Sequence, residues 1–123
     1  MSKGFYFDTY ALIEIRKGNN RYLPYTKDVD IILNNLNLME LTFYLIRTDK
    51  EKDVQDSFSE LSKNNTDYDK AILIEASRMK FKYKKEKLSF VDCIGYCLAK
   101  RHKVKFLTGD EKFRHKENVE FVK

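Results

Sequence analysis

Four acidic residues occupy positions from which their carboxylates could act together. Asp8 and Asp110 each follow a short β-prone stretch, and Glu40 and Asp92 each come about one turn into a segment with helical periodicity. Carboxylates that share one site repel each other unless a cation neutralises them. Oxygen donors suit Mg²⁺ or Mn²⁺, and such ions can activate water for attack on a phosphodiester. These four acids are the candidate catalytic residues.

The segment 88–113 is predicted to bring two of the acids to one edge of a sheet. Ser89 is a good N-cap, and Asp92 follows it by three residues, as in a capping box. From Asp92 the predicted helix descends roughly 15 Å, and the strand predicted at 104–107 returns roughly 13 Å. Asp92 and Asp110 should therefore lie near the same edge, where open α/β sheets place their sites.

The remaining segments follow one another in the order of an α/β fold. Thr9 is expected to cap the first helix, which Gly18 ends, and Asn37 is expected to cap the helix that contains Glu40. We predict strands at 4–7, 31–33, 104–107 and 119–122, and helices at 10–17, 38–48, 49–62, 67–87 and 90–103.

Three of the acids also have an ordinary structural explanation. Glu40 and Asp92 could each be the second half of a capping box, and Asp110 could serve the Thr-Gly-Asp turn. Asp8 has no strong local reason to follow an apolar aromatic strand. Taken together, four acids at converging positions favour a site.

Length and composition predict one domain over residues 1–123, and the features below place it in the cytoplasm. Hydrophobic residues make up 42% of the 123 residues, but no apolar run approaches the roughly 20 residues of a membrane span. The N-terminal segment lacks the features of a signal peptide. Cys93 and Cys97 are expected to be buried apolar side chains. The formal charge of +5 is compatible with a polyanionic partner.

The order and spacing of the motifs resemble those of PIN domains, the nuclease domains of VapC-type toxins. The resemblance covers essentially the whole chain. The motifs that carry it are Asp8-Thr9 after the first strand, Asn37-Leu-Met-Glu40, Ser89-Phe-Val-Asp92 and Thr108-Gly-Asp110-Glu-Lys-Phe113.

This resemblance implies a PIN-like three-layer fold, with a mainly parallel sheet of four or five strands flanked by helices. It implies endoribonuclease activity with Mg²⁺ or Mn²⁺, RNA as the substrate, an antitoxin protein as a partner, and a homodimer. Asp8, Asp92 and Asp110 would bind the metal, and Glu40 would complete the catalytic acids. Thr9 and Thr108 would support them.

Two residues depart from the family pattern. Tyr10 is larger than expected beside the first acid, and Lys112 stands where many members have a further acid. Lys112 therefore bears on the strength of the metal site. Phe43 and Tyr44 cannot both face inward comfortably, so we also expect an exposed aromatic surface there that a partner covers.

A second functional class stays open, a PIN-like domain that binds RNA or a protein without cutting. Its basis is a lysine-rich helix end interleaved with the aromatic residues Phe81 and Tyr83. Such a segment could track phosphates and stack on bases, or it could simply be a solvated helix end. The candidate RNA-binding residues are Lys80, Lys82, Lys84 and Lys85.

Overall fold

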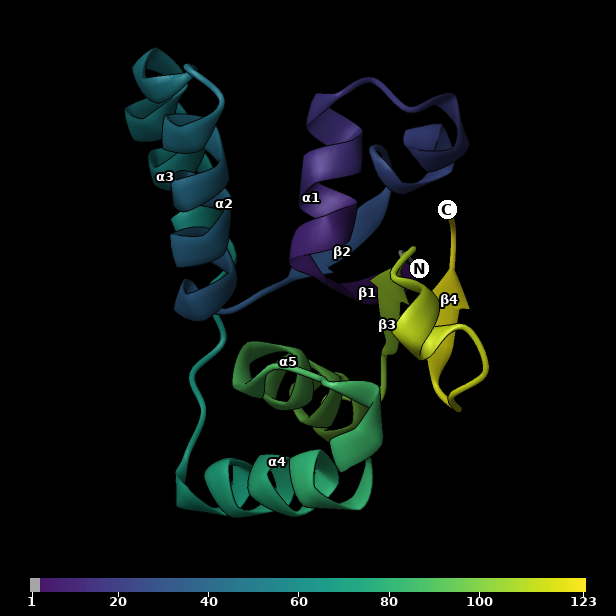
Figure 1. Ribbon diagram of the computed structural model, residues 1–123. Helices are drawn as coiled ribbons and strands as arrows, with labels where there is room; N and C mark the ends of the chain where they lie inside the picture. The colour runs from purple at the N-terminus through teal and green to yellow at the C-terminus, as the bar shows by residue number, and fades with distance from the viewer. Residues whose placement is uncertain (1–2) are drawn as a thin grey trace.

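A four-stranded parallel sheet lies at the centre of the computed structural model, which describes residues 3–123 (Figure 1). The strand order is β2-β1-β3-β4, and every pairing is parallel. The mainly parallel sheet predicted from the sequence is confirmed, with four strands in the described residues. The strands are β1 (Lys3–Phe7), β2 (Val29–Ile32), β3 (Lys105–Thr108) and β4 (Val119–Phe121).

Within residues 3–123, five α-helices and five 3-10 turns connect the strands. The helices are α1 (Thr9–Arg16), α2 (Asn35–Arg47), α3 (Val54–Leu61), α4 (Lys70–Lys82) and α5 (Phe90–Arg101). The 3-10 turns are η1 (Asn20–Tyr25), η2 (Glu51–Asp53), η3 (Ser62–Asn64), η4 (Lys84–Glu86) and η5 (Glu111–Phe113). No helix within residues 3–123 has the length and apolar character needed to cross a membrane.

The alternating side chains of β1 separate two hydrophobic cores. Phe5 and Phe7 pack in a core with residues of α1 and α2, whereas Tyr6 packs in a second core with residues of α4 and α5. This alternation follows from the two-residue repeat of a strand. Figure 1 shows α1 on one side of the sheet, α4 and α5 on the other, and the α2–α3 pair beside them. The arrangement is the expected three-layer fold.

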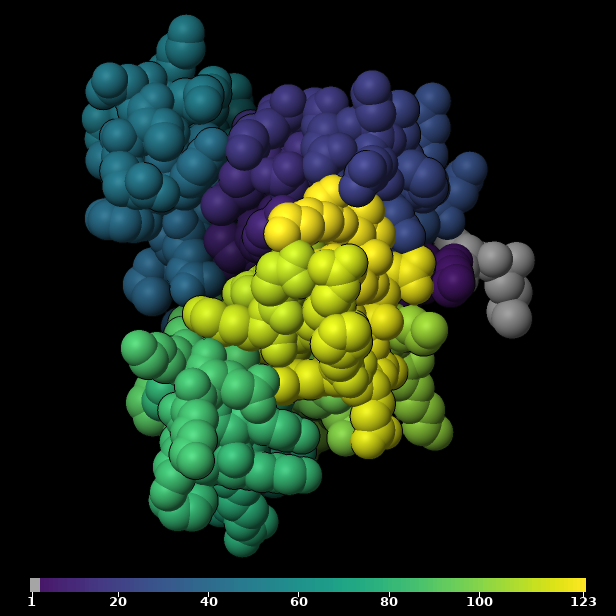
Figure 2. Space-filling view, turned by 45° about the vertical axis from the view of Figure 1, so that its right-hand side comes forward, coloured from purple at the N-terminus to yellow at the C-terminus, as the bar shows by residue number. Residues whose placement is uncertain are grey.

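The two central strands bring distant parts of the chain together. Phe7 pairs with Leu107 in the β1–β3 register, and the amide of Asp8 continues the ladder by donating to the Leu107 carbonyl at 3.0 Å. Asp8 and Thr108 therefore leave adjacent strand ends. Figure 2 shows the C-terminal segment packed over the N-terminal one.

Gly95 allows α5 to approach the sheet closely. A Cβ atom at this position would lie 2.7 Å from Cε1 of Tyr6 and 3.2 Å from Cε1 of Phe106. Real Cβ atoms do not tolerate the first distance, so a larger residue would push α5 away from β1. Because Asp92 lies one turn before Gly95 on α5, this close packing also sets the position of Asp92.

Two predicted helix caps are wrong. Asp8, not Thr9, occupies the N-cap position of α1, and Thr9 is the first helical residue. Helix α2 begins earlier than predicted, because Asn34 caps it by accepting a hydrogen bond from the Leu36 amide at 2.9 Å. Asn37 is the third helical residue, and its side chain accepts a bond from the Asn34 amide at 3.2 Å. Two other predictions are confirmed: Gly18 ends the first helix, and Ser89 and Asp92 form a capping box at the start of α5.

The two helices predicted at 49–62 and 67–87 are shorter in the structure. Asp49 has a left-handed backbone with φ of 59°, and α3 begins only at Val54. Phe58 of α3 is 41% exposed. Helix α4 ends before Lys87, another left-handed residue with φ of 58°.

Candidate active site

Asp8 is a buried carboxylate at the carboxyl end of β1. Its side chain does not cap α1. Instead, its Oδ2 atom accepts a hydrogen bond from the Thr108 hydroxyl at 2.7 Å, and the backbone amide of Thr9 also donates to it. Burial, followed by the negative charge of Asp92, raises the pKa of Asp8 to about 7 despite these donors. A carboxyl group with such a pKa titrates at neutral pH.

Thr108 connects Asp8 to the turn that carries Asp110. While its hydroxyl donates to Asp8, its oxygen accepts from the Asp110 amide at 3.1 Å. Asp110 in turn accepts from the Lys112 amide at 3.0 Å, which fixes the start of η5. Asp110 thus has the turn role considered above, and its half-buried carboxylate still lies beside Asp92.

Glu40 is held by side chains from β1, α1 and its own helix. The Thr9 hydroxyl donates to Oε1 of Glu40 at 2.5 Å, and the Asn37 amide group donates to the Thr9 oxygen at 3.3 Å. The hydroxyl of buried Tyr6 donates to Oδ1 of Asn37. Glu40 is therefore not half of a capping box. Burial raises its pKa, and the charge of Asp92 adds to that effect.

Asp92 is both a helix cap and a member of the acidic group. Its carboxylate accepts from the Ser89 amide at 2.9 Å, while its own amide donates to the Ser89 hydroxyl at 3.0 Å. Burial raises the pKa of Asp92, the Ser89 amide opposes this increase, and the charge of Asp110 adds to it. The nearby Lys112 ammonium lowers the same pKa. The structural and functional explanations of Asp92 are thus compatible.

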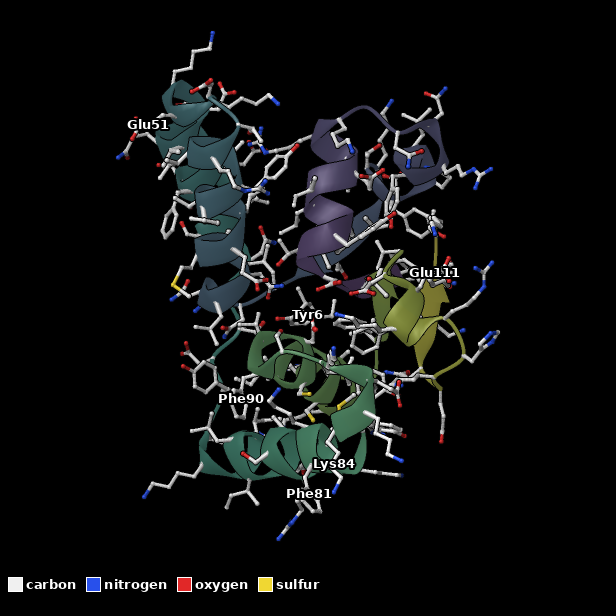
Figure 3. The ribbon with its side chains drawn as sticks, in the orientation of Figure 1. Tyr6, Glu51, Phe81, Lys84, Phe90 and Glu111 are labelled. Atoms are coloured by element: carbon white, nitrogen blue, oxygen red, sulfur yellow. The ribbon has the colours of Figure 1, made fainter. Side chains whose placement is uncertain are left out.

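All four predicted acids lie at one edge of the sheet and influence one another electrostatically. The charge of Asp92 raises the pKa of both Asp8 and Glu40, and Asp110 raises that of Asp92. Glu111 is excluded from the group, since it is exposed and pairs with Arg114 at 2.9 Å and Lys123 at 2.6 Å. Figure 3 shows Tyr6 between α1 and α5, and Glu111, the first residue of η5, away from Tyr6.

The donor chemistry of this edge fits a hard divalent cation. Every candidate ligand is a carboxylate oxygen, the donor type that Mg²⁺ and Mn²⁺ prefer. Burial is the main cause of the raised pKa values of Asp8, Glu40 and Asp92, and the charge of a neighbouring acid adds to each; a bound cation would oppose both effects. Within residues 3–123, however, no three acidic, histidine or cysteine side chains converge closely enough to hold an ion as they stand. The acidic edge therefore fits a divalent cation in the type of its donor atoms and in its charge.

The four candidate RNA-binding lysines do not form one row. Lys80 and Lys84 lie beside exposed aromatic rings on one side of α4, whereas Lys82 lines a hollow on another side. Lys85 belongs to η4 and is exposed. Lys80 is partly committed to structure, because its ammonium group donates to the Leu88 carbonyl at 2.6 Å.

Sequence reasoning missed two residues that support Glu40. Asn37 was expected only as a cap, and Tyr6 was expected only as part of an aromatic strand. The structure places both, buried, in the hydrogen-bonded chain that leads through Thr9 to Glu40. The one polar aromatic residue in the run Phe5-Tyr6-Phe7 was the available signal, because a buried tyrosine hydroxyl needs a partner.

Comparison with known proteins identifies the family. The PIN domain family profile matches residues 5–119. A solved chain of a "Toxin-antitoxin complex from Klebsiella pneumoniae" superposes with a TM-score of 0.75 at 20% sequence identity, over 94% of each chain. A search of curated protein sequences finds no significant match. The profile match spans nearly the whole chain, so the protein belongs to the PIN domain family.

Proposed function

We propose that this protein is an endoribonuclease that depends on Mg²⁺ or Mn²⁺ and is the toxin of a toxin–antitoxin pair. The observation that carries this proposal is the buried Asp8 carboxylate, whose pKa is raised to about 7 at the edge where Glu40, Asp92 and Asp110 also lie. Burying a carboxylate is unfavourable unless hydrogen bonds or an opposite charge compensate it, and carboxyl groups with strongly perturbed pKa values cluster at functional sites. PIN domains are generally nucleases, which agrees with this chemistry.

In this proposal Asp8, Asp92 and Asp110 hold the cation, and Glu40 completes the acidic group. When bound, the cation would neutralise the carboxylates and activate water for attack on an RNA phosphodiester. Thr108 and the Thr9 amide orient Asp8 through two hydrogen bonds. Since Asp8 must be ionised to bind a cation, binding releases a proton at neutral pH.

The test is cleavage of total RNA in the presence of Mn²⁺, Mg²⁺ or a chelator. Asp8→Asn and Asp92→Asn should each abolish cleavage, because they remove charge and preserve shape. Ser89→Ala is the matched control, since it damages the same capping box as Asp92→Asn but leaves all four acids in place. If both asparagine variants cut RNA as fast as wild type in Mn²⁺, the acids are structural.

The position of Lys112 near Asp92 supports a second candidate function, in which the protein binds RNA or a protein without cleaving RNA. Its ammonium group lies near enough to Asp92 to lower the pKa of that carboxyl. It can therefore supply part of the positive charge that a metal would otherwise bring. RNA binding by the wild-type protein without cleavage at any Mn²⁺ concentration would support this alternative.

The α2–α3 pair offers a surface for the proposed antitoxin. Met39, Phe43 and Ile46 recur along one face of α2 and are exposed, Phe43 to 65%; Phe58 of α3 is also exposed. An apolar surface of this kind is typical of an interface. The structural neighbour named above is part of a toxin–antitoxin complex. Phe43→Asp should weaken antitoxin binding without affecting RNA cleavage by the free protein.

A second copy of the chain is the competing occupant of this surface. We expect a homodimer, and light scattering of wild-type protein and Phe43→Asp separates the two cases. A dimer that survives Phe43→Asp leaves the α2–α3 surface to the antitoxin. A dimer that dissociates assigns this surface to self-association.

A further inference from the structure

A groove with aromatic walls lies between the C-terminal half of α4 and the start of α5. Its volume is about 350 Å³. We call it the aromatic groove, and its most exposed walls are Phe81 and Phe90, whose side chains are 71% and 57% exposed. Figure 3 labels Phe81, Lys84 and Phe90 on this part of the molecule. The residues that line the groove are Ser77, Lys80, Phe81, Lys84, Leu88 and Phe90.

A lysine ammonium group lies over each exposed ring of the groove. The Lys84 ammonium nitrogen lies 4.7 Å from the centroid of the Phe81 ring, and that of Lys80 lies 5.0 Å from the Phe90 ring. The hydrogen bond from Lys80 to the Leu88 carbonyl holds the second pair in place. The six lining residues include these two lysines and no acid. The groove therefore combines flat apolar faces with unbalanced positive charge.

The aromatic groove and the acidic edge meet at the start of α5. Phe90 is the first residue of α5, and Asp92 is the third. The ammonium group of Lys112, which affects the pKa of Asp92, reaches the Lys87 carbonyl at 3.4 Å. The turn 87–90 thus has the groove on one side and the acidic edge on the other. A chain molecule bound at the acids would have to cross this turn to enter the groove.

We propose that the aromatic groove binds unpaired nucleotides of an RNA strand next to the phosphodiester held at the acidic edge. This inference rests on the proposed nuclease function and adds a binding surface for the substrate outside the acidic edge. Bases stack on exposed aromatic side chains regardless of sequence, and the lysines beside the rings can bind the phosphates between those bases. An apolar peptide would instead cover two ammonium groups without supplying a countercharge.

Fluorescence anisotropy of a labelled oligoadenylate tests this proposal. The wild-type chain is used in the presence of a chelator, so that binding is measured without cleavage. Phe81→Ala and Phe90→Ala should each weaken binding about fivefold or more, the loss expected when one stacked base loses its ring. A duplex of the same length should bind more weakly, because its bases are already stacked and paired. Leu23→Ala is the control, because Leu23 is a 62% exposed apolar residue on η1, outside both the aromatic groove and the α2–α3 surface.

The salt dependence of binding separates the rings from the lysines. Lys84→Gln should lower the slope of log K against log salt concentration by about 0.7, the value for one lost phosphate contact on a single strand. Phe81→Ala should leave that slope unchanged. Lys27→Gln, a substitution of an exposed lysine outside the groove, is the charge control and should also leave it unchanged.

The outcomes distinguish this proposal from the nuclease proposal. If the ring variants bind the oligonucleotide as tightly as Leu23→Ala does, or if the duplex competes as well as the single strand, the aromatic groove is not a nucleotide site. Loss of antitoxin binding in Phe81→Ala, with RNA binding intact, would assign the groove to a protein and overturn the proposal. Failure of cleavage by wild type would overturn the nuclease function but leave this binding result interpretable.

Discussion

The Thr108 hydroxyl donates a hydrogen bond to the Asp8 carboxylate at 2.7 Å, although the two residues are separated by 100 positions in the sequence. Both groups are buried, and they lie at the ends of the neighbouring strands β3 and β1. Because the same threonine oxygen accepts from the Asp110 amide, one side chain sets the relative position of two proposed metal ligands.

Replacement of Thr108 by valine should therefore damage both stability and activity. Thr108→Val removes a donor to a buried carboxylate, which should lower the free energy of unfolding by roughly 1–3 kcal/mol. It should also raise the pKa of Asp8 further and shift the pH profile of cleavage to higher pH. Thr108→Ser keeps the hydroxyl and is the control. Equal pH profiles for the valine variant and wild type would contradict a positioning role for Thr108.

Asp8 should make the apo protein less stable as the pH rises from about 4 to about 7. Its pKa is raised in the folded state, so in this range the folded chain binds a proton that the unfolded chain has released. Stability is fully present at lower pH and is lost up to about pH 7, by roughly 4 kcal/mol as an upper bound.

Chemical denaturation of wild type and Asp8→Asn across this range measures the effect. The asparagine variant should be the more stable protein above about pH 7 and should show a flatter pH dependence. Mn²⁺ should stabilise wild type most at high pH, where Asp8 is ionised. A wild-type protein whose stability does not fall across the range would show that Asp8 titrates normally.

The hydrogen bond from Thr9 to Glu40 should set the pH at which Glu40 ionises. Thr9 lowers the pKa of Glu40 against the effect of burial. Thr9→Val should raise this pKa, slow cleavage and move the acidic limb of the pH–rate profile to higher pH, whereas Thr9→Ser should resemble wild type. A loss of rate in Thr9→Val without any change in the profile would indicate a purely structural effect.

Lys112 should weaken cation binding at the acidic edge. Lys112→Asp replaces a positive charge near Asp92 with a further carboxylate, so the Mn²⁺ concentration for half-maximal cleavage should fall about two- to fivefold, a modest change because the residue is exposed. Lys112→Met removes only the positive charge and should give a smaller decrease. An unchanged Mn²⁺ requirement in both variants would remove Lys112 from the description of the site.

Local sequence signals predicted some of these features well. The Ser89–Asp92 capping box and the left-handed Gly18 depend on neighbours within a few residues, and both are confirmed. The strand positions were also correct to within two residues, because short aromatic and β-branched runs stand between clear turn signals. These features let the sequence predict that four acids gather at one edge.

Features that depend on distant contacts were not predictable in this way. Asn34, Asn35 and Asn37 are all good capping residues. Hydrogen bonds with the distant Thr66 hold Leu33 and Asn34 in place, so that Asn34 becomes the N-cap of α2. The bond from Thr9 to Glu40 spans 31 positions and has no local signature. On α3 the small Ser57 is buried and the large Phe58 is 41% exposed, a difference that helical spacing alone does not predict.

The strand order β2-β1-β3-β4 has a consequence for the synthesis of this protein on the ribosome. Strand β1 pairs with β2 on one side and with β3 on the other. Its pairing on the β3 side can form only after residues 105–107 have been synthesised. A nascent chain that stops before β3 already contains Asp8, Glu40 and Asp92, yet it lacks Thr108, Asp110 and the strand that aligns them. Long-range pairing of this kind forms late because its loop-closure cost comes first. If the proposed activity needs the complete acidic edge, a nascent chain that ends before Thr108 and Asp110 should not cut RNA.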